Sequence, residues 1–516
     1  MGFICILSLS LVFLGGCDLR EIVEVENPSW KAAPVEALGY LGYDDADIKL
    51  TVCGNCHVDQ QAQWQTTVHA VAWAGLQTSD HAAAYCENCH TVSQNGNFAT
   101  EPVGYETTGD ERYHDVQCES CHGGGEIHSQ GPSSTQPVPS IDLGDLADLT
   151  LAQSCAECHQ GTHHPFVEQW SESAHAKIGT SPQDRGGSCA GCHRGQEAIA
   201  RLGGNPSYIE ADDVEHQGIT CVVCHDPHGS EFSAQTRMDV ETIDLGANLC
   251  AQCHNRRSEP DPGSSHGMHP HSPSVAMLTG EAGWFPPGME INIGQIVATH
   301  GSDKNLQGCA TCHVSGFEVT DAATGEFVIQ SVGHTFDAIP CVDVNGAPTG
   351  ETGCEITLDA RNFSGCSISG CHSTPGAAQQ ALANTSAEIE HLAEMLHEAI
   401  LLVDPNGEDA GGEVDGRDGV WTVAEGGVFN HSLAEFGEDT YSASVHNPFL
   451  TKALLVGSLK AIEDTYGVVV PGKGTQDWDA MLADIMAAAP QGVTPWKAVY
   501  YEDTISSREL RDLNSW

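Results

Sequence analysis

Cysteine and histidine recur in this chain at one fixed spacing. Sixteen of its 22 cysteines fall into eight copies of the pattern C-x-x-C-H. Two thiols at this spacing can reach the two vinyl edges of one porphyrin, and the next residue, a histidine, falls beneath the iron. The pattern therefore predicts c-type haem. Zinc ribbons and dithiol redox motifs also use C-x-x-C, but they do not place a histidine after every pair. The eight copies are Cys53/Cys56/His57, Cys86/Cys89/His90, Cys118/Cys121/His122, Cys155/Cys158/His159, Cys189/Cys192/His193, Cys221/Cys224/His225, Cys250/Cys253/His254 and Cys309/Cys312/His313.

A wider variant occurs in the stretch "FSGCSISGCHST", residues 363–374. Here four residues separate Cys366 from Cys371, and His372 follows at once. A longer loop can still bring two thiols to one ring if it bulges outward, so we expect a ninth haem, with His372 as the proximal ligand. A disulfide beside an ordinary histidine is the alternative.

The remaining cysteines indicate export. The N-terminus, "MGFICILSLSLVFLGGCD", is an apolar run too short for a permanent membrane span. It resembles a bacterial lipoprotein leader covering residues 1–17. A lipid on Cys17 would then anchor the protein to a membrane. A plain signal peptide is the alternative. Both predict a periplasmic or cell-surface protein, or an extracellular one. For an exported chain we also expect a disulfide between Cys341 and Cys354.

The first six motifs form an internal repeat. They begin at residues 53, 86 and 118 and again at 155, 189 and 221, so equivalent cysteines are 102, 103 and 103 residues apart. The flanking sequences correspond as well, for example "WQTTVHA" (64–70) and "WSESAHA" (170–176). A trihaem module has been duplicated, over residues 51–150 and 151–248.

Histidines outside the motifs are the candidates for the second, distal iron ligand. Three recur at equivalent places in the two modules, which suggests that every iron is bound by two imidazoles. Residues 249–375 carry haems seven to nine with looser spacing, and there His266 and His269 compete with His271. Histidines without a counterpart, such as His81, His163 and His164, are expected to be solvated. The distal candidates are His69, His114, His128, His175, His216, His228, His271, His300, His334 and His446.

The last part of the chain, residues 376–516, is predicted to be helical. Apolar residues at helical spacing predict a helix over 385–403, with Thr385 and Glu388 as a capping box. Pro448 opens a second helix that stops at Gly467, and a third runs over about 477–489. His391 and His397 are expected to be solvated.

The charge balance limits the partners. The formal net charge is −51 with only 20 lysine and arginine residues, which excludes nucleic acid because phosphate contacts need cations. Solubility in a saline medium explains the acidity, and docking to a basic redox partner is the functional alternative. The acidic, glycine-rich loop at 404–419 could hold calcium, but its spacing matches no full template, and we expect a linker. Residues 18–50 are interpreted as a tether.

Several motif segments resemble known families. "YCENCHTVS" and "VQCESCHGGGEIH" resemble the tetrahaem carriers that serve hydroxylamine oxidation, and "GITCVVCHDPHG" with "NLCAQCHN" is similar to decahaem and octahaem respiratory carriers. The C-x4-C-H motif resembles a variant known among multihaem cytochromes. The resemblance implies a mostly α architecture with extensive irregular loops, in which haems stack as a chain, plus a C-terminal helical segment like that of nitrite reductases and hydroxylamine oxidoreductases. Those nitrite reductases typically carry a lysine in one motif, whereas all nine motifs here end in histidine.

Two functions are compatible with these features. The leading hypothesis is an electron conduit through nine mainly bis-histidine haems, exchanging electrons with redox partner proteins; a homo-oligomer or filament is compatible with this role. The alternative is a reductase or oxidase of nitrite, hydroxylamine or a sulfur oxyanion, which needs one iron with an open distal position. The conduit is favoured because the distal candidates outnumber the nine haems, and no catalytic residue is assigned.

Overall fold

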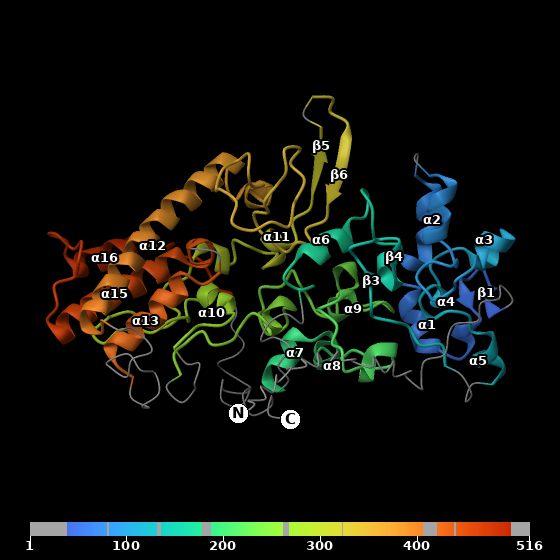
Figure 1. Ribbon diagram of the computed structural model, residues 1–516, viewed down its shortest axis with the longest axis horizontal. Helices are drawn as coiled ribbons and strands as arrows, with labels where there is room; N and C mark the ends of the chain where they lie inside the picture. The colour runs from blue at the N-terminus through green and yellow to red at the C-terminus, as the bar shows by residue number, and fades with distance from the viewer. Residues whose placement is uncertain are drawn as a thin grey trace, which may run out of the picture.

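The computed structural model describes residues 39–79, 82–131, 136–177, 187–261, 268–321, 323–405, 421–437 and 440–496. The leader with Cys17, most of the tether, His81, His266 and most of the acidic loop at 404–419 lie outside these ranges. The molecule is elongated, and the segments with haem motifs follow one another along its long axis (Figure 1). The N-terminal module lies at one end of Figure 1 and the C-terminal helices lie at the other.

The part of the chain with haem motifs is built from short helices, 3-10 turns and three two-stranded antiparallel sheets, with long irregular connections. The first module holds β1 (Tyr43–Asp45), β2 (Leu50–Thr51), α1 (Val58–Trp64), α2 (Ala72–Gln77), α3 (Tyr105–Thr108), α4 (Cys118–His122) and α5 (Glu126–Gln130). The second holds β3 (Gly144–Asp145), β4 (Leu151–Ala152), α6 (Phe166–Glu172), α7 (Ala190–His193), α8 (Gly195–Arg201) and α9 (Cys221–Cys224). The third segment holds α10 (Ser274–Thr279), α11 (Ala310–His313), β5 (Phe317–Thr320) and β6 (Phe327–Ser331).

The two modules repeat the same long-range hydrogen bonds. The Trp64 indole donates to the Val116 carbonyl at 2.9 Å, and the Trp170 indole donates to the Ile219 carbonyl at 2.8 Å. The backbone N–H of Val116 donates to the backbone carbonyl of His69, and that of Ile219 donates to the backbone carbonyl of His175. The duplication read from the sequence is therefore also a duplication of contacts, which hold equivalent histidines at equivalent places.

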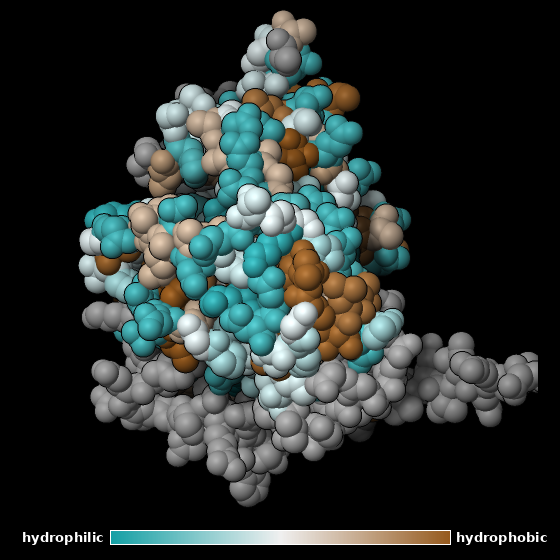
Figure 2. Space-filling model, turned by 90° about the vertical axis from the view of Figure 1, so that its left-hand side faces the viewer, coloured by the Kyte–Doolittle hydropathy of each residue, from teal (hydrophilic) through white to brown (hydrophobic). Residues whose placement is uncertain are grey.

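The C-terminal helices contain the largest apolar core of the described chain. They are α12 (Pro375–Val403), α13 (Val423–Ala434), α14 (Tyr441–His446), α15 (Pro448–Tyr466) and α16 (Trp478–Ala488). α15 is central, since Leu454, Leu455 and Leu459 are almost fully buried among α12 and α13. The motif segments have only small apolar clusters. Figure 2 faces the helical end of the molecule and shows a largely hydrophilic surface with several apolar areas, the largest of them on the lower right of the view.

The helix boundaries agree with the sequence at two helices and differ at one. α15 begins at Pro448 and ends at Gly467 in the left-handed conformation, and α16 spans nearly the predicted range. α12, however, begins ten residues before the predicted start, because the hydroxyl of Thr374 accepts from the Ala377 N–H and Pro375 occupies the first turn. The predicted capping box at Thr385 therefore lies inside the helix. α13 was not predicted. Within the described residues, no helix combines the length and apolar character needed to cross a bilayer.

Asn447 joins the helical core to the motif segments. It interrupts the helical path between α14 and α15, and its side chain accepts from the Leu450 N–H at 3.1 Å. Its amide also donates to the carbonyls of Met277 at 2.9 Å and Ile296 at 2.8 Å, and Asn447 is fully buried. This break in the helix sets the direction of His446, the residue before it.

We expect Asn447→Ala to lower the free energy of unfolding by about 3 kcal/mol, because it removes a cap, takes the donor from the Ile296 carbonyl and leaves the Met277 carbonyl with only the Gly280 N–H at 3.2 Å. Thr374→Ala is the matched control: it removes only the exposed cap of α12 and should cost about 1 kcal/mol. Denaturant unfolding followed by far-UV circular dichroism measures both. Equal losses would mean that the bonds to Met277 and Ile296 contribute nothing.

Candidate haem sites

Five motifs fold into one turn that is closed in the same way, whereas in the second motif the His90 N–H donates to the Glu87 carbonyl at 3.0 Å. In the five motifs the histidine N–H donates to the carbonyl of the first cysteine, at 2.9 Å for His57 and Cys53 and at 3.0 Å for His313 and Cys309. The same bond closes the fourth, sixth and seventh motifs. Both cysteines and the imidazole are thereby brought to one side of a short loop, as attachment to one porphyrin requires. We number the sites 1 to 9 in the order of their motifs.

The second cysteine of site 1 lies at the surface rather than in an enclosed position. Cys56, which the motif assigns to one haem edge, is exposed, whereas Cys53 is half-buried and contacts Cys118. The turn is nevertheless formed, since the Cys56 N–H donates to the Cys53 carbonyl at 3.1 Å. Attachment of haem through Cys56 stays a prediction, and Cys189 and Cys371 are exposed in the same way.

The ninth motif reaches the same closure despite its longer loop. The His372 N–H donates to the Cys366 carbonyl at 3.2 Å, so the two additional residues bulge out of the turn. Cys366 and Cys371 are both free thiols, whereas Cys341 and Cys354 form a disulfide. The geometry fits a ninth haem site and does not contain the alternative disulfide between Cys366 and Cys371.

Eight motif imidazoles face a second imidazole at nearly the same distance. The ring centroids of these pairs are 5.9 to 6.3 Å apart. Two imidazoles on opposite sides of one metal, each bound at about 2.0 Å with its centroid about 1.2 Å behind the nitrogen, would be roughly 6.4 Å apart. The spacing therefore fits an iron between the rings of each pair. The pairs, with the motif histidine first, are His57/His128, His122/His228, His159/His69, His193/His271, His225/His334, His254/His175, His313/His446 and His372/His300.

Most of these pairs join different modules. His69, after the first motif, faces His159 of the second module, and His175 faces His254 of the third segment. In the opposite direction, His228 of the second module faces His122 of the first. The pair His57/His128 is internal to the first module. Six of the eight pairs thus join different segments, and His57/His128 and His372/His300 are the two internal pairs.

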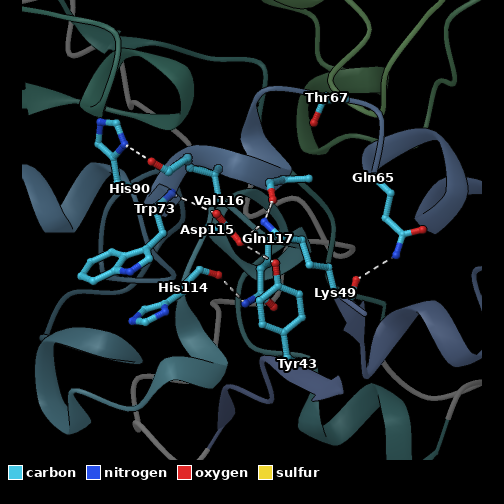
Figure 3. A network of polar contacts seen from close by, with 12 residues as sticks. Tyr43, Lys49, Gln65, Thr67, Trp73, His90, His114, Asp115, Val116 and Gln117 are labelled. Carbon is cyan, nitrogen blue, oxygen red and sulfur yellow. Dashed lines mark hydrogen bonds and ion pairs between the residues drawn. The ribbon is translucent and has the colours of Figure 1, made fainter. Parts of the chain in front are cut away.

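Site 2 is arranged differently. Nδ1 of His90 lies 2.9 Å from the Ala72 carbonyl, as Figure 3 shows, and the imidazole that interacts with His90 is that of His164. Partial burial, followed by the charge of His90, lowers the pKa of His164. His163 instead stacks on Phe327, with 4.8 Å between ring centroids. The sequence predicts a solvated His164, whereas in the structure this histidine interacts with His90 of site 2.

Two distal candidates lie elsewhere. The ring of His114 stacks flat on Trp73, with centroids 4.0 Å apart and 9° between the planes (Figure 3). Among the described residues, neither His114 nor His216 faces a motif histidine at the spacing of the eight pairs, and Nδ1 of His216 is buried without a hydrogen-bond partner. The repeated position of these two histidines therefore does not reflect a pair like the others.

A buried carboxylate organises the surroundings of His114. Asp115 accepts from the Tyr43 hydroxyl at 2.8 Å, from the Lys49 ammonium at 2.9 Å and from the Trp73 N–H at 2.9 Å (Figure 3). It adopts a positive φ of 70°. This network holds Trp73 against His114 and so stabilises the segment on which Ala72 accepts from His90.

Several site histidines direct Nδ1 at a backbone carbonyl. Such bonds link His122 to Pro137 at 3.0 Å, His225 to Ala234 at 2.7 Å and His313 to Phe336 at 2.8 Å. On the distal side, His300 contacts the Val445 carbonyl at 2.6 Å and His446 contacts that of Ser442 at 2.9 Å. A proton held on Nδ1 leaves the Nε2 lone pair for a metal, which is the usual arrangement of metal-binding histidines.

Burial keeps three of the site imidazoles neutral. It lowers the pKa of His446 to about 3 and that of His254 and His175 to about 4, with smaller contributions from neighbouring histidines. Only the neutral ring can coordinate iron. These three imidazoles are therefore in the protonation state that metal binding requires.

The fifth and seventh sites share an arginine. Nη1 of Arg201 lies 2.8 Å from Sγ of Cys192 and 3.8 Å from Sγ of Cys253. The pKa of Cys192 is lowered to about 5, first by its hydrogen bond with Cys253 and further by Arg201 and Arg256. Positive charge beside a haem stabilises its reduced form. Arg201 would therefore raise the reduction potential of haems held at sites 5 and 7, in an otherwise acidic chain.

Comparison with known proteins agrees with this reading of the sites. A family model described as cytochrome c554 and c-prime matches residues 52–123, and one described as a doubled CXXCH motif matches residues 214–259. The chain is a multihaem c-type cytochrome. Among curated proteins it is similar to the C-type polyheme cytochrome OmcB of two Geobacter sulfurreducens strains, at 24% identity over 256 residues. This alignment covers 44% of the chain and 31% of the relative, so the chain spans about a third of the proteins it matches.

A solved structure shares the fold. The outer cell wall cytochrome OcwA aligns with a TM-score of 0.51 and 15% identity, over 82% of this chain and all of that one. At this identity the likeness concerns the fold alone.

We expect the double variant Cys366→Ser/Cys371→Ser to bind one haem fewer than the parent, because both thioether bonds of site 9 are lost. Haem per chain is measured by the pyridine haemochrome method and by intact mass. The control, Cys341→Ser/Cys354→Ser, removes the disulfide and should leave the haem count unchanged. An unchanged count in the first variant would contradict a haem at site 9.

We expect His164→Ala to convert one haem to the high-spin form, because it removes the imidazole beside His90. His114→Ala, which removes the ring stacked on Trp73, should leave the spin states unchanged. Low-temperature EPR of the oxidised proteins, integrated against haem content, measures both. The opposite pattern would make His114 the distal ligand of site 2.

Proposed function

We propose that the protein is an electron conduit, in which nine covalently attached haems pass electrons between redox partner proteins outside the cytoplasm. The pairing of the imidazoles carries this proposal: eight motif histidines face a second histidine at 5.9 to 6.3 Å, and His164 lies by the remaining one. Haem iron, when bound, supplies reversible one-electron exchange. At the eight paired sites, two histidines leave no axial position for a substrate.

The reduction potentials of the haems in such a conduit depend on their axial ligands and on the charge of the protein. Histidine in both axial positions gives lower reduction potentials than histidine with methionine. A formal net charge of −51 disfavours the reduced, more negative state and lowers the potentials further. Low-potential respiratory electron transfer is the role that these properties suit, and a redox partner with a basic docking face is the complement of this surface.

The proposed location is the periplasm or the cell surface. Haem c is attached outside the cytoplasm, and the leader-like N-terminus ending at Cys17 supports export with a lipid anchor. The similar protein OcwA is named an outer cell wall cytochrome, which favours the surface. Assembly into a homo-oligomer or filament would extend the same role. A closer relation to carriers of hydroxylamine oxidation rests on the match over residues 52–123.

A reductase of nitrite, hydroxylamine or a sulfur oxyanion is the second candidate, and one observation favours it. Site 2 alone among the described motifs has its second imidazole on an exposed residue, His164, outside the narrow range of the other pairs. Such a ligand could exchange with a small anion. If the protein is an enzyme, we infer that site 2 is its reaction centre.

Low-temperature EPR of the fully oxidised protein, integrated against a chemical haem count, distinguishes the two functions. The conduit predicts nine haems, all low-spin, with a spectrum that does not change when nitrite or hydroxylamine is added. A high-spin signal equal to one haem that shifts with either additive would replace the conduit by the reductase. His164→Ala provides the reference spectrum for an open site 2.

A further inference from the structure

The hairpin of β5 and β6 leads into a short segment, residues 332–336, that contacts histidines of three sites (Figure 1). The segment contains His334, whose ring faces His225 of site 6 at 6.3 Å. Two residues later, Phe336 lies against histidines of sites 7 and 8. Its ring and its carbonyl make separate contacts. The inference drawn from them rests on the function proposed above, since it concerns the ligands of the haems.

The ring of Phe336 makes a T-shaped contact with His175, the histidine that faces His254 of site 7. The two ring centroids are 4.6 Å apart, and the planes make an angle of 79°. The same ring lies 5.4 Å from the ring of His334, at an angle of 50°. Aromatic rings in contact prefer particular relative orientations. Phe336 therefore restrains the planes of two second imidazoles at once.

The carbonyl of Phe336 contacts the third site. It lies 2.8 Å from Nδ1 of His313, the motif histidine of site 8. The backbone of Phe336 has a φ of 58°, in the left-handed region that bulky side chains rarely adopt. Such a conformation costs free energy and persists only where the surrounding structure holds it. Here the contacts of the ring and of the carbonyl hold the residue in that conformation.

The second module contains the same backbone contact without the ring. The carbonyl of Ala234 lies 2.7 Å from Nδ1 of His225, and Ala234 also has a left-handed φ, of 51°. A small residue is therefore sufficient for the hydrogen bond to the motif histidine. The ring of Phe336 adds the contacts with His175 and His334.

Gln169 of α6 fixes the segment that carries both rings. Its side chain is buried, and Oε1 accepts from the Val332 N–H at 3.2 Å and from the His334 N–H at 3.1 Å. The Phe336 N–H donates to the Gly333 carbonyl at 3.2 Å, which closes the turn. The position of Phe336 is thus set by the second module as well as by the third segment.

The two sites whose rings Phe336 contacts differ in the angle between their paired imidazoles. The angle is 75° for His254 and His175 at site 7, but 15° for His225 and His334 at site 6. In a low-spin haem with two imidazole ligands, this angle fixes the relative energies of the iron orbitals, one of which gains or loses the electron. Nearly perpendicular planes give an EPR signal with a large maximum g value, whereas nearly parallel planes give a rhombic signal.

We propose that the ring of Phe336 is a positioning element for the second imidazoles of sites 6 and 7. It holds His175 nearly perpendicular to the motif ring of site 7 and His334 nearly parallel to that of site 6. The carbonyl of Phe336 orients His313 of site 8. A single residue outside every motif thereby sets the electronic state of neighbouring haems in the conduit.

Low-temperature EPR of the oxidised protein with its haems tests this role. His175→Ala and His334→Ala assign the signals, because each removes the low-spin signal of one site. Phe336→Ala removes the ring and keeps the carbonyl, as at Ala234. Each imidazole then relaxes from its restrained angle, so we expect the maximum g value of site 7 to fall and that of site 6 to rise. The haem count should not change.

Phe327→Ala is the matched control, since its ring stacks on His163, which belongs to none of the eight pairs, and both signals should stay in place. Phe336→Gly also lacks the ring and provides the same test if the alanine variant does not fold. Signals of sites 6 and 7 that do not shift without the ring, or a His175→Ala spectrum that keeps every low-spin signal, would overturn the proposal. A spectrum that changes with nitrite or hydroxylamine would instead contradict the conduit and leave the role of Phe336 standing.

Discussion

The structure depends on pairs of imidazoles about 6 Å apart, one from a haem motif and one from a distant part of the chain. Such a pair is a long-range contact whose strength comes from the metal that it fits rather than from apolar burial. This explains how segments with only small apolar clusters can keep a defined arrangement over most of the chain. In those segments, covalent bonds to haem and axial ligands would take the place of a core.

Histidines of one module face motif histidines of the next, and these pairs connect the repeated modules. His69 and His175 occupy equivalent positions, and each faces the first motif of the following segment. His300 continues the series by facing His372 of the ninth motif. In the first module, the ring of His128 faces His57 of the same module. The same local fold is thus tied to its neighbours on both sides.

The C-terminal helices contribute in another way. Their apolar core is of the ordinary kind, and they provide one site histidine, His446, at the end of α14. Its direction is set by the break at Asn447, whose amide binds carbonyls of the third segment. A conventional helical domain therefore completes site 8 and covers the end of the motif-bearing part of the chain.

Features that depend on a few consecutive residues could be predicted from the amino-acid sequence alone. These are the motifs and the type of haem, the duplication of the module, and the helix that starts at Pro448 and ends at Gly467. Attachment to a porphyrin, capping and termination act within one or two turns of the backbone, so their residues lie next to one another in the chain.

Which second imidazole faces which motif could not be predicted from the sequence and is seen in the folded chain. His114 and His216 recur in the repeat as regularly as His69 and His175, yet His114 stacks on Trp73, and His164, which has no counterpart in the repeat, lies by His90. The physical reason is that a distal ligand needs only a ring at the right point in space. That condition puts no constraint on the residues beside it, so no local pattern marks it.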